Sequence, residues 1–324
     1  MIQRKYAVVT LLTFMIAALL AACGGGGGGS TAPAPALIQM GGAIQGAALN
    51  LTTAVTTFAG QAGLVGSTDG TGAAARLNYS RAITTDGTSL YVADTDNDTV
   101  RKIVIASGAV TTLAGQAGLA GSTDGTGAAA LFNTPRGITT DGTSLYVADS
   151  GNDTVRKIVI ASGAVTTLAG TAGTTGSTDG TGAAALFNTP RGITTDGTSL
   201  YVADRSNDTV RKIVIASGAV TTLAGTATVT GSTDGTGAAA RFNTPYGVTT
   251  DGTNLYVADT SNNTVRQIVI ASGTVTTLAG TAGIFGSTDA TGAAARFNGP
   301  QGITTDGTSL YVADSGNDTV RKIK

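Results

Sequence analysis

The acidic side chains come nearest to a reactive site in this sequence. All 20 acidic residues are Asp, because the chain contains no Glu, and it also has no His. Three of the aspartates alternate in the segment Asp94-Thr-Asp96-Asn-Asp98, which looks like the start of a calcium-binding loop. An EF-hand loop would need Gly after the third acidic position and a Glu further on, whereas Thr99 stands there and Glu is absent. We interpret these aspartates as turn and capping residues, with a bound calcium as the alternative.

Composition excludes the commonest catalytic constellations. A Ser-His-Asp or Cys-His arrangement needs His, and zinc sites of the usual type use His or Cys; the chain has no His and a single Cys. Catalysis by paired aspartates stays open, but each Asp recurs in five nearly identical settings, which favours a structural role. We therefore expect no catalytic, cofactor-binding or metal residues, and we favour a non-catalytic protein.

The only cysteine, Cys23, follows a segment typical of secretion. A positively charged start precedes an apolar stretch over 7–20, which is too short for a comfortable transmembrane helix. The stretch ends in Leu20-Ala-Ala-Cys23, which resembles the lipobox of bacterial lipoproteins. This resemblance implies cleavage before Cys23 and a diacylglycerol on its thiol, and it makes residues 1–22 a lipoprotein signal peptide. The alternative is an ordinary signal peptide with an incidental cysteine.

Residues 23–50 read as a tether and lead-in. Six glycines make a flexible spacer after Cys23, and the Pro-containing run at 31–36 stiffens its far end. We expect a protein of the bacterial cell envelope, attached to the membrane through its lipid. Because Gly24 and not Asp follows the cysteine, an outer-membrane destination is expected if the host is Gram-negative. The mature chain would carry 17 basic and 20 acidic residues and few aromatic ones, so no nucleic-acid partner is expected.

One unit of 55 residues has been copied along the chain. Its phrase Tyr-Val-Ala-Asp occurs five times, starting at Tyr91, Tyr146, Tyr201, Tyr256 and Tyr311. In the copy at 136–170, four short runs rich in Val, Ile, Thr and Tyr are separated by Gly-containing turns, which predicts four antiparallel strands. Radially stacked four-stranded sheets are the blades of a β-propeller. We predict an all-β, monomeric propeller over residues 51–324.

Recurring motifs resemble those of bacterial NHL-repeat propeller proteins over 55–324. They are Asp-Gly-Thr-Gly-Ala-Ala-Ala-Arg-Phe-Asn, Pro-x-Gly-Ile, Leu-Tyr-Val-Ala-Asp, Asn-Asp-Thr-Val-Arg-Lys-Ile and Val-Thr-Thr-Leu-Ala-Gly. The resemblance implies a surface that binds a ligand or partner, and some relatives are enzymes. Propeller gluconolactonases hold their metal with Glu, Asn and Asp, and the peptide-amidating lyases need His. Neither activity carries over to a chain without Glu and His.

Strand counting favours five blades. The fourth-strand motif occurs five times, starting with Val55-Thr-Thr-Phe58, whereas the last copy stops inside its third strand at Lys324. We expect Val55–Phe58 to complete the C-terminal blade and close the ring, which would leave no exposed strand edges. The resemblance favours six blades as the alternative, because NHL propellers are commonly six-bladed. A truncated longer array also stays open.

Three further expectations concern packing. Asp179 or Thr181 should cap a helical turn formed by the following Ala run, and Phe187 should fill the seam between two blades. The repeated Arg-Lys pairs are expected at the blade edges, paired with Asp.

The copies differ at few positions, and most of these map to one face of a propeller. The turns expected on the opposite face, Asp-Gly-Thr-Ser and Ala-Ser-Gly, hardly vary. Binding residues are usually placed on loops of a rigid scaffold, although neutral drift after duplication would also produce variation. The candidate binding face consists of Arg81, Arg136, Arg191, Tyr246, Gln301, Arg205, Arg241 and Arg296.

These observations predict an interaction scaffold that binds a protein, peptide or glycan. One alternative is a calcium-dependent hydrolase or lyase of the lactonase-like propeller type. A second alternative is a purely structural envelope protein.

Overall fold

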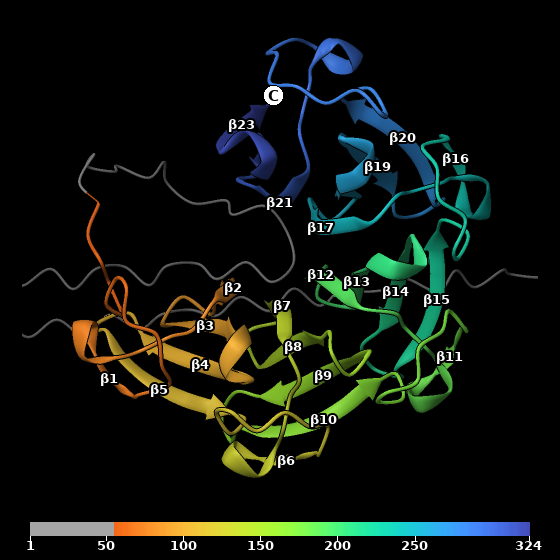
Figure 1. Cartoon of the computed structure of the whole chain (residues 1–324). Coiled ribbons are helices and arrows are strands. Elements are labelled where there is room, and N and C mark those ends of the chain that lie inside the picture. Colours follow the sequence, from red (N-terminus) through yellow and green to blue (C-terminus); the bar gives the residue numbers. More distant parts are fainter. Residues whose placement is uncertain (1–54) are drawn as a thin grey trace, which may run out of the picture. The chain divides into compact units, whose positions relative to one another are not determined.

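The computed structural model describes residues 55–324, which form five antiparallel sheets arranged one after another around a common centre (Figure 1). Each of the first four sheets has four six-residue strands and a two-residue strand at its outer edge, and the last sheet has three strands. The predicted all-β propeller with five blades is therefore confirmed. The signal peptide, Cys23, the tether and the lead-in up to residue 54 lie outside the described residues.

The strand bounds follow the 55-residue period. The innermost strands are β2 (Ser80–Thr85), β7 (Pro135–Thr140), β12 (Pro190–Thr195), β17 (Pro245–Thr250) and β21 (Pro300–Thr305). The second strands are β3 (Ser89–Asp94), β8 (Ser144–Asp149), β13 (Ser199–Asp204), β18 (Asn254–Asp259) and β22 (Leu310–Asp314). The third strands are β4 (Thr99–Val104), β9 (Thr154–Val159), β14 (Thr209–Val214), β19 (Thr264–Val269) and β23 (Thr319–Ile323).

Fourth strands close the outer side of four sheets. They are β5 (Ala109–Ala114), β10 (Ala164–Ala169), β15 (Ala219–Ala224) and β20 (Thr274–Ala279). A two-residue strand from the preceding connector pairs with each of them: β1 (Gly70–Thr71), β6 (Gly125–Thr126), β11 (Gly180–Thr181) and β16 (Gly235–Thr236). Short 3-10 turns occur in the connectors and after most second strands: η1 (Gly72–Ala74), η2 (Thr95–Asn97), η3 (Gly127–Ala129), η4 (Gly182–Ala184), η5 (Arg205–Asn207), η6 (Gly237–Ala239), η7 (Thr260–Asn262), η8 (Gly292–Ala294) and η9 (Ser315–Asn317). Within residues 55–324, no helix has the length and apolar character needed to cross a membrane.

An aspartate builds the turn between the first and second strands. The Asp141 carboxylate accepts hydrogen bonds from the N–H groups of Thr143 (2.8 Å) and Ser144 (2.7 Å), and Gly142 supplies the positive φ of 88° that the turn requires. The hydroxyl of Tyr146 donates to the same carboxylate at 2.7 Å. The Tyr of the repeated phrase is therefore bound to the turn that precedes it.

Neighbouring blades bury their apolar faces against each other. Between the second and third blades, Tyr146 and Val155 pack with Leu200 and Ile213, and all four side chains are fully buried. Phe187, from the connector, is also fully buried in this seam, as predicted. The proposed helix cap is not formed, since η4 has no side-chain cap at Thr181.

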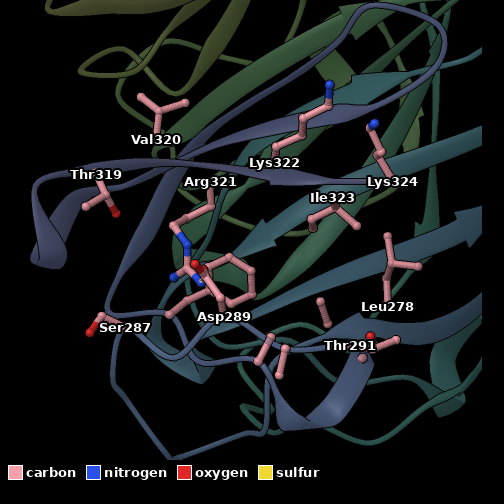
Figure 2. A pocket seen from close by; sticks show the side chains of 15 residues that line it. Leu278, Ser287, Asp289, Thr291, Thr319, Val320, Arg321, Lys322, Ile323 and Lys324 are labelled. Carbon is pink, nitrogen blue, oxygen red and sulfur yellow. Dashed lines mark hydrogen bonds and ion pairs between the residues drawn. The ribbon is translucent and has the colours of Figure 1, made fainter.

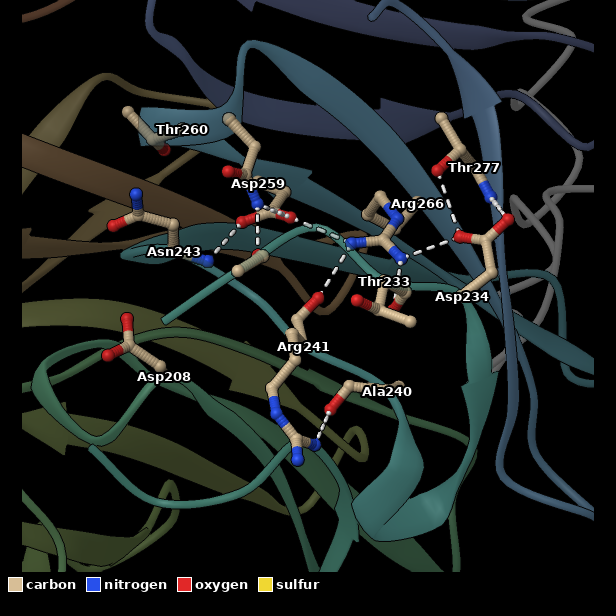
Figure 3. A network of polar contacts seen from close by, with 12 residues as sticks. Asp208, Thr233, Asp234, Ala240, Arg241, Asn243, Asp259, Thr260, Arg266 and Thr277 are labelled. Carbon is tan, nitrogen blue, oxygen red and sulfur yellow. Dashed lines mark hydrogen bonds and ion pairs between the residues drawn. The ribbon is translucent and has the colours of Figure 1, made fainter. Parts of the chain in front are cut away.

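A buried arginine ties each connector to its blade (Figure 3). The guanidinium of Arg266 donates to Asp259 at 3.0 Å and to Asp234 at 2.7 Å, and it also donates to the carbonyl oxygens of Arg241 and Thr233. Arg266 and Asp259 are fully buried. The predicted pairing of these arginines with Asp is found. The prediction that the arginines lie at the blade edges is wrong, because Arg266 is buried inside the blade. Asp179 has this connector role towards Arg211 and caps no helix.

The predicted closing strand is not formed in this structure. Val55–Phe58 has no strand partner, and the last sheet contains only β21, β22 and β23. The N–H of Gly60 donates to Gly72 at 3.0 Å, as Gly115 does to Gly127 at 3.1 Å one blade later. The segment around Phe58 therefore lies against the connector of the first blade. The end of the outer strand of the first blade lies in the same way against the connector of the second blade.

An open groove of about 730 Å³ lies beside β23 (Figure 2). Its walls are β23 on one side and residues 289–292 of the connector on the other, and Phe297 and Ala295 also line it. In the first four sheets, the space between the third strand and the connector holds a fourth strand. The last blade thus lacks both the fourth strand and the two-residue strand of the other blades.

The two end faces of the array stay exposed. Ile83 on the first blade is 59% exposed, whereas its counterpart Ile138 is 6% exposed. Val320 on the last blade is 74% exposed, whereas its counterpart Val100 is completely buried. Positions that are buried at the first three internal junctions are therefore open to solvent at both ends of the described chain.

Candidate functional site

Five of the eight candidate residues line a single pocket. Arg81, Arg136, Arg191, Tyr246 and Gln301 each stand near the start of an innermost strand, one per blade, and together they border a cavity of about 170 Å³. We call these five residues the Arg–Tyr cluster. Because they occupy the same position of the 55-residue unit, the propeller places all five around its centre.

Glycines next to the cluster let the innermost strands come close together. A Cβ atom on Gly137 would collide with the carbonyl oxygen of Arg191, and one on Gly192 would collide with the carbonyl oxygen of Tyr246. Gly247 has the same relation to Gln301. Only glycine, which has no side chain, fits at these positions. It lets the innermost strands come close enough to surround a narrow pocket.

Tyr246 lies at the centre of the cluster. Its hydroxyl oxygen accepts hydrogen bonds from Nη1 of Arg81 at 3.0 Å and from Nη1 of Arg191 at 3.2 Å. The guanidinium of Arg191 also lies 5.1 Å from the centre of the Tyr246 ring, within the range of a cation–π contact. Arg81 makes a similar contact with the ring of Tyr79 at 4.2 Å.

The positive charges of the cluster repel one another. Burial lowers the pKa of Arg136, and the nearby charge of Arg81 lowers it further. Burial and the charge of Arg136 lower the pKa of Arg191 to about 10. Burial raises the pKa of Tyr246, but the charges of Arg191, Arg81 and Arg136 outweigh it and lower the pKa below its ordinary value. Among residues 55–324, no carboxylate forms an ion pair with the three arginines.

Some donors of the cluster have no acceptor. Nε and Nη1 of Arg136 and Nε of Arg191 are buried, and none of them has a hydrogen-bond partner in the described part of the chain. Buried polar groups are hydrogen-bonded in the great majority of cases, so each exception needs an explanation. These N–H groups are available to an acceptor that enters the pocket.

Arg205 adds a fourth positive charge next to this cluster, and its charge contributes to the lowered pKa of Arg191. In three other copies a Thr or Ser at this position donates a hydrogen bond to the first residue of the next innermost strand. These bonds run from Thr95 to Pro135 at 2.7 Å, from Ser150 to Pro190, and from Thr260 to Pro300 at 2.7 Å. The third copy therefore replaces a bond between blades with a charge.

Arg241 and Arg296 do not join the cluster. Nη1 of Arg241 donates to the carbonyl oxygens of Ala238 and Ala240, and Arg296 makes the equivalent bonds in its own connector. Neither residue lines the pocket. The structure thus brings five of the eight candidates around one pocket and places Arg205 near Arg191, whereas Arg241 and Arg296 bond within their own connectors.

Comparison of the copies did not single out Tyr79, which lies beside the Arg–Tyr cluster. It is 60% exposed, has a φ of 54°, and packs against Arg81. Its counterparts are Thr134, Thr189, Thr244 and Gly299, so a comparison of the copies carries the signal.

The aspartates of the calcium-like segment bind protein groups. The buried carboxylate of Asp94 accepts hydrogen bonds from the N–H of Asn78, from Asn97 and from Arg101. Asp98 accepts the N–H of Thr134 in the next blade at 2.7 Å. Across residues 55–324, no group of three or more His, Cys, Asp or Glu side chains is arranged to hold a metal ion.

The chain has homologues among proteins with NHL repeats. It is 29% identical over 293 residues to the human NHL repeat-containing protein 2, and the match covers 79% of this chain. It is 28% identical over 250 residues, or 72% of this chain, to the chloroplastic protein SUPPRESSOR OF QUENCHING 1 of Arabidopsis thaliana. The matches span 40% and 24% of the lengths of these two relatives. No family model matches the chain.

Solved structures show the same fold. A structural genomics protein from Bacteroides thetaiotaomicron has a TM-score of 0.52 at 21% identity, and the match covers 82% of this chain and 74% of that one. An auxiliary nutrient binding protein from Bacteroides ovatus has a TM-score of 0.51 at 18% identity, covering 74% of this chain and 67% of that one. A chain of a nidogen/laminin complex has a TM-score of 0.54 at 17% identity, covering 76% of both chains. The homologues and the propeller fold agree with the resemblance seen in the motifs.

Proposed function

We propose that this protein is a lipid-anchored scaffold of the bacterial cell envelope that binds a protein, peptide or glycan at the face carrying the Arg–Tyr cluster. One observation carries the binding role: among the few positions that differ between nearly identical copies, the one occupied by Arg81, Arg136, Arg191, Tyr246 and Gln301 surrounds one pocket at the centre of the propeller. Arg205 also supports this role, because it replaces a bond between blades with a positive charge near Arg191. The relatives support a binding role, since one structural neighbour is a nutrient-binding protein and another was solved in a complex with a protein partner.

Partner capture from envelope extracts tests this role. The purified full-length protein is immobilised beside a variant in which Arg136, Arg191, Tyr246 and Gln301 are all replaced by Ala. We expect the wild type to retain a partner that the variant does not retain. Undiminished capture by the variant would rule out this face.

A control variant that removes positive charge elsewhere separates the pocket from general surface charge. Arg76, Arg241 and Arg296 lie in the connectors and bond mainly to backbone carbonyl groups there. Their replacement by Gln removes three positive charges away from the Arg–Tyr cluster. The control should capture the partner as the wild type does.

The lipid anchor and envelope location rest on the segment ending in Cys23. A calcium-dependent hydrolase or lyase is the alternative function. Metal analysis of the purified protein and a melting curve with and without calcium test it, and a bound metal together with a raised melting temperature would favour this alternative. A structural envelope protein without a specific ligand is the remaining alternative.

A further inference from the structure

We propose that the Arg–Tyr cluster binds one oxyanionic group, a carboxylate or a sulfate, of a small acidic ligand. The proposal rests on the proposed binding role of this face and names the chemistry of its ligand. Three guanidinium groups, those of Arg81, Arg136 and Arg191, border one cavity. Arginine presents a planar fork of N–H donors that matches the two oxygens of a carboxylate.

The arginines are not needed to build the fold. Tyr246 and Gln301 occupy the same position in the fourth and fifth blades, so the innermost strand accepts uncharged residues there. Placing like charges together in a partly buried pocket is unfavourable. An anion bound between the arginines would reduce their mutual repulsion. A bound anion therefore explains the clustered charges, whereas the fold does not require them.

The pocket has more donors than acceptors. Within it, the hydroxyl of Tyr246 already accepts from both Arg81 and Arg191. Nε and Nη1 of Arg136 and Nε of Arg191 are buried and have no partner within residues 55–324. An oxyanion supplies several lone pairs at one point and would satisfy these donors with charge-assisted bonds.

Size limits the ligand. A cavity of about 170 Å³ accepts one anionic group and the few atoms around it. Ile138, Ile193, Val248 and Ile303 also line the cavity, so its wall is partly apolar. A sugar acid or a sulfated sugar unit combines an anionic group with a compact body and matches this lining.

Titration calorimetry on the full-length protein tests the proposal with three probes: sodium glucuronate, sodium sulfate and glucose. Glucose has the ring of glucuronate without its charge and should not bind. Binding of glucuronate alone identifies a carboxylate site, whereas binding of sulfate identifies a site for sulfate groups. The proposal is overturned if neither anion binds, or if glucose binds as well as glucuronate.

Substitution then assigns the binding to the cluster. Arg81→Gln, Arg136→Gln and Arg191→Gln introduce the residue that Gln301 already places at this position, so the propeller should keep its melting temperature. Each change should weaken anion binding by about tenfold or more, because it removes a charge-assisted hydrogen bond to the anion. The control variant with Arg76, Arg241 and Arg296 replaced by Gln should bind as the wild type does. Equal losses in both sets would overturn the assignment.

The outcomes also separate this inference from the binding scaffold. If neither anion binds but the Ala variant still loses its partner, the scaffold stands and the anion site fails. If glucuronate or sulfate binds but capture does not depend on this face, the anion site stands and the scaffold fails.

Discussion

Arg81 in the first blade donates a hydrogen bond of 3.0 Å to the hydroxyl of Tyr246 in the fourth blade, 165 residues further along the chain. The bond crosses the centre of the propeller, and Arg191 donates to the same oxygen from the third blade. One phenol thereby joins two cationic side chains from different blades. Its ionisation is consequently a direct probe of the Arg–Tyr cluster.

Tyr246 should ionise below the ordinary tyrosine pKa of about 10. The charges of Arg191, Arg81 and Arg136 lower its pKa despite its burial, and the uncharged Gln301 lines the same pocket. Alkaline titration followed by ultraviolet absorbance measures phenolate formation. Subtracting the curve of Tyr246→Phe from that of the wild type isolates this one of the eight tyrosines. A midpoint at or above 10 would contradict the expectation.

Anion binding should weaken over the same pH range. A phenolate at Tyr246 would neutralise part of the positive charge of Arg81 and Arg191 and so compete with the ligand. The glucuronate affinity of the wild type is expected to fall as the pH rises through the lowered pKa. In Tyr246→Phe the part of this decrease that comes from the phenolate should be absent.

Arg156→Met should destabilise the protein strongly. Arg156 and Asp149 are fully buried and form an ion pair of 3.0 Å, so the substitution leaves a buried carboxylate without its counter-charge. Such a loss costs about 3–5 kcal/mol in the free energy of unfolding. Denaturant unfolding measures it.

Arg321→Met is the matched control in the last blade. The Arg321 side chain is 12% exposed and one of its partners, Asp289, is 93% exposed. Water can therefore replace part of the lost interaction, and the destabilisation should be smaller. Equal losses at both positions would mean that burial does not determine the contribution of this ion pair.

The turn aspartates should make the protein sensitive to acid. Burial opposes ionisation of Asp86, but hydrogen bonds led by that from Tyr91 outweigh it and lower its pKa to about 2. The pKa values of Asp141, Asp196 and Asp251 are also lowered. A carboxylate with a lowered pKa in the folded state stabilises the protein above its unfolded pKa of about 3.9, and this stability is lost as the pH falls towards the folded value.

Melting temperatures between pH 5 and pH 2 check this expectation. Replacing Tyr91, Tyr146, Tyr201 and Tyr256 by Phe removes one donor from each turn carboxylate and should make the decrease shallower.

Burial acts in the opposite direction on Asp149, Asp204 and Asp259 and raises their pKa to about 6, so their contribution is lost as the pH rises through that value. The highest stability is therefore expected in mildly acidic solution.

Gly192→Ala should strain the innermost strands. The added Cβ would collide with the carbonyl oxygen of Tyr246, and overpacking of this kind costs about 1–3 kcal/mol. Gly302→Ala is the control, because the nearest atom to its added Cβ is the Cβ of Ala313 at 3.4 Å. The first blade has Ala82 at the position of these glycines. There β2 and β3 also pair through Ala82 and Ala93, and the second blade has no equivalent pair. Thermal melting of the two variants should differ, and equal stability would contradict a close-packing role for Gly192.

Cys23→Ser tests the anchor. If Cys23 carries a lipid, the variant should appear in the soluble fraction or persist as an unprocessed precursor. Fractionation and the electrophoretic mobility of the two forms measure this. A variant that stays in the membrane fraction with the mobility of the mature wild type would argue for attachment by other means.

The sequence predicts the fold well because its copies are nearly identical. A period of 55 residues with four strand-like runs determines five blades, and it also implies that Arg81, Arg136 and Arg191 share one radius. The burial of Arg101 and Asp94 could not be found by comparing copies, since both residues are the same in every copy. The sequence does hold a hint, because Arg101 lies two residues before Ile103 and therefore shares its buried face of the strand. The side chains of Arg241 and Arg296 are oriented by hydrogen bonds to nearby backbone carbonyl groups. No pattern in the sequence predicts these bonds.

The exposed end faces have a consequence for how molecules meet in solution. The face around Val320 corresponds to the one that packs against the counterparts of Ile83, since equivalent residues pack together at the first three internal junctions. The relation between the two faces is head to tail, as it is between consecutive blades. The uniformity of the blades that makes the fold easy to recognise therefore also gives the two end faces of residues 55–324 complementary sets of apolar residues.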